Sequence, residues 1–306
     1  MKTIIYAEKF FLTSGVEGPG YLEITDGVFG KVTKDKPEGD VEVIDYTGKW
    51  IAPGLVDTHI HGYKNNDVMD NNGDGIKQMS EDLLECGVTS YLPTTLTSSR
   101  EQLTAVAKTI GEVYKDAKGA KIQGIYFEGP FFTEEHKGAQ NPSYFSDPDI
   151  NVFNEWQEAS GNIIKKIALA PERAGVSEFV KEVTDSGVVV SLGHSNATIA
   201  EAKEAVEAGA SVFVHAFNGM RGLNHREPGM VGALLQLQHV FSELICDGHH
   251  VHPDAAEILM EKAGHDHVAL ITDCMMAGGM PDGDYMLGEF PVVVKEGTAR
   301  MKEGNL

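Results

Sequence analysis

The sequence predicts an α/β protein built on a (β/α)8 barrel that follows a small β unit, and three observations lead to this prediction. Eight apolar segments of strand length, rich in β-branched residues, recur between residues 51 and 275. Segments with helical periodicity alternate with them. Histidines and acidic residues lie where many of the strand segments end, and the carboxyl ends of barrel strands are where active sites are built.

Composition bounds the class of protein. The 306 residues suffice for one large domain, with or without a small satellite. With 46 acidic against 25 basic residues, the net charge of −21 argues against nucleic acid or an anionic membrane surface as a partner. No stretch approaches the roughly 18 apolar residues of a membrane span. The start, MKTIIYAEKFFLTSG, does not resemble a signal peptide, and three scattered cysteines fit a reducing cytoplasm, so we expect a cytoplasmic protein.

Residues 1–50 read as short strands and turns, with apolar runs at 3–13, 20–33 and 41–50. Asp26-Gly27 lies between two apolar stretches and predicts a hairpin. We therefore expect residues 1–50 to belong to a small β domain and residues 51–306 to form the barrel.

The eight predicted strands lie within residues 51–61, 88–95, 122–130, 163–172, 187–195, 211–219, 241–251 and 267–275. Helices are predicted at 99–117, 177–187, 198–209 and 253–264, several with a Ser, Thr or Asp near the start and a glycine at the end. The segment 131–149 is too long for a simple connection, and long loops in such barrels commonly cover the active site.

The first strand segment ends in His59-Ile60-His61-Gly62. Residues i and i+2 of a strand point to the same face, about 7 Å apart, so both imidazoles can lean toward one point. The pair alone is also compatible with two partly exposed polar residues at a strand end.

Further polar residues resolve this ambiguity. Beside His59 and His61, the predicted carboxyl ends of other strands carry Glu128, His194, His215, His250 and Asp273. A lone histidine at a strand end is more often a hydrogen-bonded residue than a ligand. Unpaired acidic groups on one rim would, however, be costly, so the set predicts a metal centre.

Sequence motifs then identify a family resemblance. GKWIAPGLVDTHIHG at residues 48–62 resembles the first-strand signature of the amidohydrolase superfamily. The segments YFEGPF, SLGHS, HAFNGM, HREPG, DGHHVHP and ITDCM follow in the order seen in the N-acetylglucosamine-6-phosphate deacetylase family. The resemblance implies a metal-dependent hydrolase barrel with a small β-sandwich made by both chain ends. Family members continue past the point matching Leu306, so the barrel and sandwich are expected to be incomplete in this chain.

The resemblance also implies residue roles. Glu128, His194 and His215 match the principal metal ligands, while His59 and His61 match a second site, with Glu128 as the expected bridge. Imidazole and carboxylate ligands admit Zn, Fe, Mn or Co, with one or two ions per subunit.

The remaining roles concern catalysis and the substrate. Asp273 matches the general base, and His250 with the Asn218-Gly219 segment matches sugar- and phosphate-contacting positions. Arg226 matches an arginine that reaches the substrate phosphate of a neighbouring subunit, which implies a homodimer. The alternative to this phosphate role is that Arg226 forms a surface ion pair with the adjacent Glu227.

Two positions depart from the family pattern. Gln140 stands where some members carry a histidine that polarises the acetyl carbonyl, and its amide can also donate a hydrogen bond. Cys274 follows the general base, and we interpret it as a small buried hydrophobe rather than a ligand.

The function implied is metal-dependent deacetylation of N-acetyl-D-glucosamine 6-phosphate to glucosamine 6-phosphate and acetate, in amino-sugar catabolism. One alternative is an amidohydrolase that acts on a cyclic amide, like dihydroorotase or hydantoinase. Those enzymes use a carboxylated lysine on strand four, whereas Lys165 and Lys166 stand at the start of that strand, the wrong end for ligation. A catalytically inactive binding barrel is the other alternative, although no expected ligand is missing.

Overall fold

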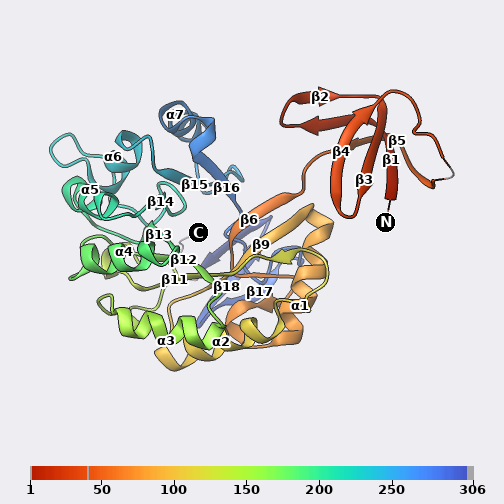
Figure 1. Ribbon diagram of the computed structural model, residues 1–306. Helices are drawn as coiled ribbons and strands as arrows, with labels where there is room; N and C mark the ends of the chain where they lie inside the picture. Colours follow the sequence, from red (N-terminus) through yellow and green to blue (C-terminus); the bar gives the residue numbers. More distant parts are fainter. Residues whose placement is uncertain (1, 40, 302–306) are drawn as a thin grey trace. The chain divides into compact units, whose positions relative to one another are not determined.

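The computed structural model describes residues 2–39 and 41–301 (Figure 1). Contacts divide the chain into two compact units, Met1–Leu55 and Val56–Leu306. Within the described residues, no helix combines the length and apolar character needed to cross a membrane.

The first unit is a five-stranded sheet. Its strands are β1 (Lys2–Leu12), β2 (Gly15–Glu17), β3 (Gly20–Thr25), β4 (Val28–Thr33) and β5 (Val43–Ile51), and β5 pairs with β1 in parallel. The predicted hairpin is confirmed between β3 and β4, where Asp26 and Gly27 both have positive φ angles of 49° and 80°. Two positive φ values in a two-residue turn match the right-handed twist of the flanking strands. Ala7, Phe10 and Leu22 form the small core of this sheet.

The second unit is a parallel barrel, as predicted. Its strands are β6 (Leu55–Ile60), β9 (Val88–Thr95), β11 (Ile125–Phe131), β12 (Ile164–Leu169), β13 (Val189–Leu192), β14 (Val212–Phe213), β15 (Phe241–Ile245) and β16 (Val268–Ile271). Each predicted segment contains one of them, except that β11 extends one residue beyond its segment, to Phe131. Beyond the last strand, a parallel bridge between Ile60 and Cys274 returns the sheet toward its first strand.

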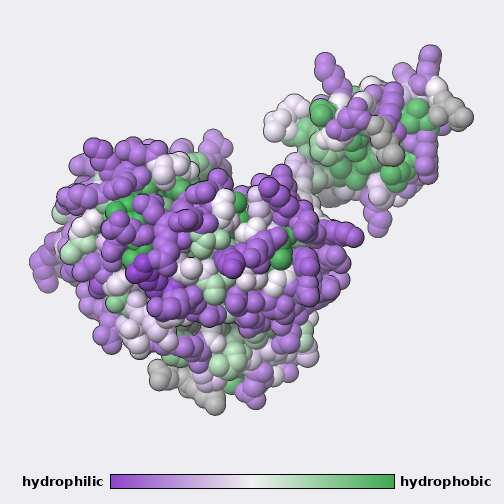
Figure 2. Space-filling view, turned by 60° about the horizontal axis from the view of Figure 1, so that its bottom comes forward, coloured by the Kyte–Doolittle hydropathy of each residue, from purple (hydrophilic) through white to green (hydrophobic). Residues whose placement is uncertain are grey.

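Helices surround the strands (Figure 1). They are α1 (Gly73–Asp82), α2 (Arg100–Val113), α3 (Ile150–Ser160), α4 (Val176–Asp185), α5 (Ile199–Glu207), α6 (Gly229–Gln236) and α7 (Pro253–Ala263). The capping prediction is confirmed at α2, where the Ser99 side chain accepts from the Gln102 amide, and at α5, where Thr198 and Glu201 form a capping box. The face shown in Figure 2 is largely hydrophilic over this unit.

Shorter strands and 3-10 turns lie between the main barrel strands and helices along the chain. They are the strands β7 (Gly62–Tyr63), β8 (Asn66–Asp67) and β10 (Lys121–Ile122) and the 3-10 turns η1 (Val68–Asp70), η2 (Leu83–Cys86), η3 (Glu134–His136), η4 (Pro142–Tyr144) and η5 (His265–His267). After β16 the chain forms an antiparallel sheet of β17 (Gly283–Leu287), β18 (Phe290–Lys295) and β19 (Thr298–Met301).

The main core lies between the strands and the helices. It includes a ring cluster in which Trp156 of α3 lies 5.0 Å from Phe127 and 5.9 Å from Phe131, both on β11. The barrel interior is mixed, because the buried apolar residues Leu92, Tyr126, Ala168 and Val214 share it with charged groups. Those charged groups include Lys166 and Glu243, which form an ion pair.

Candidate metal centre

Four histidines and two carboxylates converge where the barrel strands end. His59 and Glu128 lie on β6 and β11, and His61 follows β6 directly. His194, His215 and Asp273 each lie two residues beyond β13, β14 and β16. All but Asp273, whose side chain is 24% exposed, are buried.

Two groups of ligand atoms form within this cluster, and Glu128 belongs to both. In the first group, Glu128 Oε1 lies 3.1 Å from His194 Nε2 and 3.2 Å from His215 Nε2. In the second, Glu128 Oε2 lies 3.2 Å from His61 Nε2, whose neighbour His59 Nε2 is 3.3 Å away. A single carboxylate therefore faces two sets of imidazoles, as a bridging ligand would.

Asp273 adjoins the second group. Its Oδ1 atom lies 3.2 Å from His59 Nε2 and 3.0 Å from His61 Nε2. The carboxylate thus stands beside the candidate ligand atoms, and it is the most exposed member of the cluster.

The other ring nitrogens of the four histidines determine the tautomers. Each Nδ1 faces an oxygen that accepts hydrogen bonds: Thr94 O for His61 at 3.1 Å, His136 O for His194 at 3.0 Å, Asn218 O for His215 at 3.1 Å, and Glu243 Oε2 for His59 at 3.3 Å. Carbonyl and carboxylate oxygens only accept, so Nδ1 must carry the proton. In the neutral rings every Nε2 lone pair then points into the cluster, which is the arrangement that metal ligation requires.

Electrostatics also favour a cation. Burial raises the pKa of the Glu128 and Asp273 carboxyls, but the adjacent imidazoles outweigh it and hold both pKa values well below their usual range. Burial lowers the pKa of His61, yet its contacts with Asp273 and Glu128 raise that pKa to about 9. The cluster therefore stabilises positive charge at its centre, and its donor set fits a divalent transition metal.

Three site residues hold unusual backbone conformations. His194, His215 and Asp273 have φ angles of 46°, 26° and 51°, in the left-handed region that side chains generally avoid. Such conformations cost of order 1–3 kcal/mol each and cluster at functional sites. They also explain why β14 is shorter than predicted, because the chain leaves the extended conformation at His215.

Of the predicted substrate-contacting residues, three contact the cluster in the described part of the chain and two do not. Gln140, Asn218 and Gly219 are the three that do. Gln140, in the long loop after β11, donates from Nε2 to Glu128 Oε2 at 2.7 Å and accepts from the Thr97 amide at 2.8 Å. Gly219 lies against His194, since an added Cβ would come within 3.0 Å of its Nδ1. Asn218 contributes the carbonyl that accepts from His215.

Arg226 and His250 lie on exposed loops, where no hydrogen bond or ion pair joins them to the metal-ligand cluster within the described chain. His250 Nδ1 lies 2.7 Å from Asp247 Oδ2. The alternative of an Arg226–Glu227 ion pair is not seen among the described residues. Glu227 instead accepts from the amides of Ile199 and Gly229 at 2.9 and 3.1 Å.

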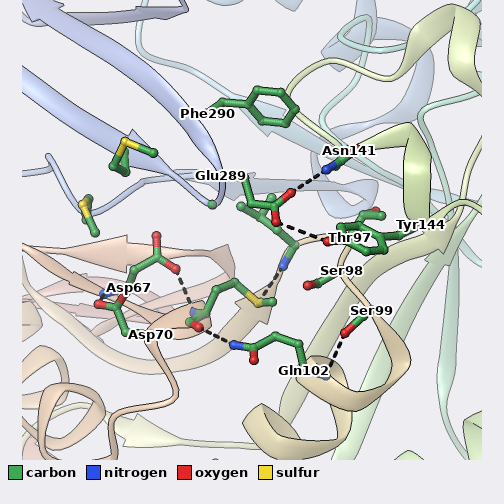
Figure 3. Close-up of a pocket in the computed structure, with 15 residues that line it drawn as sticks. Asp67, Asp70, Thr97, Ser98, Ser99, Gln102, Asn141, Tyr144, Glu289 and Phe290 are labelled. Atoms are coloured by element: carbon green, nitrogen blue, oxygen red, sulfur yellow. Dashed lines mark hydrogen bonds between the residues drawn. The ribbon is translucent and has the colours of Figure 1, made fainter.

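A cavity of about 470 Å³ is shown in Figure 3, and none of the six residues of the cluster lines it. Thr97, whose amide is bound by Gln140, is part of its wall. Glu289 reaches in from the β17–β18 turn and accepts hydrogen bonds from Asn141 and Tyr144 of the long loop (Figure 3). The loop predicted to cover the active site therefore contacts both the cluster and this cavity.

Sequence reasoning missed the buried charges beneath the ligands. Asp57 accepts from the backbone amides of His59 and Thr272 at 3.2 and 3.4 Å, and so ties β6 to β16. Glu243 of β15 and Lys166 of β12 form an ion pair inside the barrel. The available signals were Glu243 in the apolar run FSELI, the two lysines in IKKIAL, and the period-two spacing of Asp57, His59 and His61.

Cys274 only partly matches its predicted role. It is half-buried and packs against the main core, and it belongs to neither group of ligand atoms. Burial raises the pKa of its thiol to about 12, which disfavours the thiolate that a metal would need.

Comparison with known proteins supports this picture. The amidohydrolase family model matches residues 50–284. The chain is 42% identical over 257 residues to the N-acetylglucosamine-6-phosphate deacetylase of Vibrio furnissii, covering 84% of this chain and 64% of that protein. It is 37% identical to the N-acetylgalactosamine-6-phosphate deacetylase of Escherichia coli O157:H7, covering 100% and 80%.

A solved structure has a similar fold. The N-acetylglucosamine-6-phosphate deacetylase of Pasteurella multocida matches with a TM-score of 0.93 at 27% identity, covering 100% of this chain and 80% of that one. The chain thus spans about two thirds to four fifths of the length of these relatives.

Proposed function

The chain belongs to the amidohydrolase family, and from this premise we propose that it removes the acetyl group from N-acetyl-D-glucosamine 6-phosphate, releasing glucosamine 6-phosphate and acetate in amino-sugar catabolism. The observation that carries the proposal is the buried cluster in which Glu128 faces both histidine pairs beside the more exposed Asp273. The names of the relatives above support the substrate class, an N-acetylated amino-sugar phosphate.

Glu128, His194 and His215 would hold one divalent metal, and His59 and His61 a second that shares Glu128. Zinc, iron, manganese and cobalt all suit these ligands. When bound, such an ion lowers the pKa of a water toward 7 and polarises an acyl oxygen.

Asp273 would act as the acid and base of the reaction. Although its burial opposes ionisation, the histidines keep its pKa well below the usual range, so it is an acceptor at neutral pH. It takes a proton from the attacking water and returns it to the amine, since an amide nitrogen leaves poorly unless protonated.

Gln140 would help to stabilise the acyl oxygen as it gains negative charge. Its Nε2 carries two hydrogens, and the contact with Glu128 uses one of them. The second can donate to the substrate. Gln140 also accepts from the amide of Thr97, which lines the cavity of Figure 3.

Phosphate would be bound by cations on the loops beyond β14 and β15. Arg226 is free of any ion pair in the described chain, and Arg221 lies near it, with Nη1 donating to Asn196 O at 3.3 Å. Arginine grips phosphate through two parallel hydrogen bonds. We further propose that His250 and the Asn218-Gly219 segment contact the sugar phosphate, and that Arg226 acts on the site of a second subunit in a homodimer.

The cyclic-amide alternative is not favoured, because Glu128 faces both histidine pairs and Lys166 is held by Glu243. A carboxylated Lys166 would carry negative charge beside that carboxylate. An inactive barrel is likewise not favoured, since the sequence lacks none of the expected ligands and keeps Asp273.

Acetate release with metal analysis tests the function. Purified protein is assayed with N-acetylglucosamine 6-phosphate, its galactosamine epimer and dihydroorotate, with and without added Zn²⁺ or Co²⁺. We expect acetate from the amino-sugar phosphates alone. Turnover of dihydroorotate, or no turnover by metal-loaded protein, would contradict the proposal. We also expect the protein in the cytoplasm, which cell fractionation tests.

A further inference from the structure

We propose that Glu243, itself held by Lys166, is a positioning residue that orients His59 and thereby makes the His59–His61 pair able to bind the second metal. This inference rests on the proposed metal centre but not on the identity of the substrate. Neither Glu243 nor Lys166 has a ligand atom in either metal-ligand group.

The contacts of Glu243 are divided between its two oxygens. Oε2 lies 3.3 Å from His59 Nδ1, while Oε1 accepts from Thr58 Oγ1 at 3.0 Å and from the Lys166 ammonium. Glu243 is only 1% exposed, so water does not compete for these positions. The carboxylate is thus fixed from one side and presents its other oxygen to the histidine.

Lys166 is fixed in turn. It is buried, and its Nζ lies 3.8 Å from the centroid of the Tyr126 ring in addition to its bond with Glu243. The same ring packs edge-on against His59, with centroids 4.9 Å apart at 86°. Tyr126 and Glu243 therefore both contact His59, and Lys166 contacts both of them.

This arrangement has a chemical consequence for one histidine of the four. The others donate Nδ1–H to a backbone carbonyl, whereas His59 alone donates to a carboxylate. A carboxylate fixes the tautomer more strongly and makes Nε2 a better donor to metal. The cost of burying that carboxylate is offset by Lys166, which explains a charged pair inside a barrel.

The test measures metal binding without substrate, so its result is independent of the deacetylase assignment. Metal-free wild type, Glu243→Gln and Lys165→Met are equilibrated with buffered Zn²⁺, and bound zinc is counted by mass spectrometry. Lys165 is the matched control, because it is an exposed lysine on the same strand. We expect two ions in the wild type and the control. In Glu243→Gln one tight ion should remain, and the other should bind about 10–100-fold more weakly.

A second variant guards against misfolding, because Glu243→Gln leaves Lys166 unpaired. The double variant Lys166→Met/Glu243→Gln removes both charges together, and circular dichroism verifies its fold. It should show the same selective weakening. Equal weakening of both ions, unchanged binding in the folded variants, or a wild type that saturates at one ion would each overturn the proposal.

Discussion

The backbone amide of Asp273 donates a hydrogen bond of 2.9 Å to the carbonyl of His59. This bond joins the end of the last barrel strand to the first, and it brings the Asp273 carboxylate to within 3.2 Å of His59 Nε2. At this position Asp273 adopts a φ angle of 51°, a left-handed conformation that costs of order 1–3 kcal/mol. The hydrogen bond that joins the last barrel strand to the first therefore also positions the proposed base.

Asp273→Asn tests the base. Asparagine tolerates positive φ and matches aspartate in size, so the backbone should keep its conformation. It cannot accept the proton of water, and we expect kcat for acetate release to fall by at least about 10²-fold. Turnover close to that of the wild type would rule out the assignment, provided that metal content is retained.

Removal of the metal should abolish activity and lower the melting temperature. An ion that binds only the folded state stabilises it by about 2.7 kcal/mol at 100 times its Kd. We expect chelated protein to regain activity and stability on addition of Zn²⁺ or Co²⁺. His194→Ala should lose both the ion and the activity, while His265→Ala, at an exposed position in η5, serves as the control. Full activity after verified metal removal would contradict the mechanism.

Comparing Gly219→Ala with Gly161→Ala separates the cost of a positive φ angle from the effect of a steric contact with His194. Gly219 has a φ of 58°, and a Cβ there would lie 3.0 Å from His194 Nδ1. Gly161 has a φ of 72° with nothing within 4 Å, so Gly161→Ala carries the backbone cost alone. Gly161→Ala should lower the free energy of unfolding by about 1–2 kcal/mol, and Gly219→Ala by at least as much. Only Gly219→Ala should weaken metal binding, and equal binding by both variants would show that the contact is unimportant.

Subunit mixing tests the shared phosphate site. Arg226→Ala and Asp273→Asn proteins, each inactive by expectation, are mixed under conditions that allow exchange. If Arg226 acts across an interface, some heterodimers contain one site with both groups intact, and activity should return. A single chain carrying both substitutions, mixed with itself, is the control. Demonstrated exchange without recovery would mean that each subunit uses its own Arg226.

Stability should depend on pH through Asp67. Burial raises the pKa of this carboxyl to about 6, above its ordinary value, and Oδ2 has no hydrogen-bond partner within the described chain. Because the folded pKa is raised, ionisation is penalised in the folded state, and stability is lost as pH rises through about 4 to 6.

Asp67→Asn should therefore stabilise the metal-free protein above pH 6, by on the order of 2–3 kcal/mol, with the gain vanishing below about pH 4. The amide oxygen can still cap the Met69 amide, as Asp67 Oδ1 does at 2.8 Å. Urea unfolding at pH 4 and 8 measures the difference. A gain of equal size at both pH values would point to another cause.

Much of the barrel was predictable because its signals are local. Buried parallel strands read as short apolar runs, and the polar residues that end them are visible at fixed positions, so all eight strand segments and the residues of the candidate metal cluster could be named in advance. The helices α2, α4, α5 and α7 have apolar periodicity, and α2, α5 and α7 also begin with a side-chain cap. The prediction missed three helices: α1, which begins with two glycines in three residues, α3, and α6, whose sequence GMVGALLQ is apolar on nearly every face.

Only the tertiary structure decided which distant residues meet. Lys166 and Glu243 are far apart in sequence, and their pairing follows from which strand positions point into the barrel at the same level. The same holds for the contact of Gln140 with Glu128 and for the closeness of Gly219 to His194. A sequence specifies the ends of strands through local propensity, but hydrogen-bond partners depend on sheet register and loop path, which exist only once the strands have assembled around a shared interior.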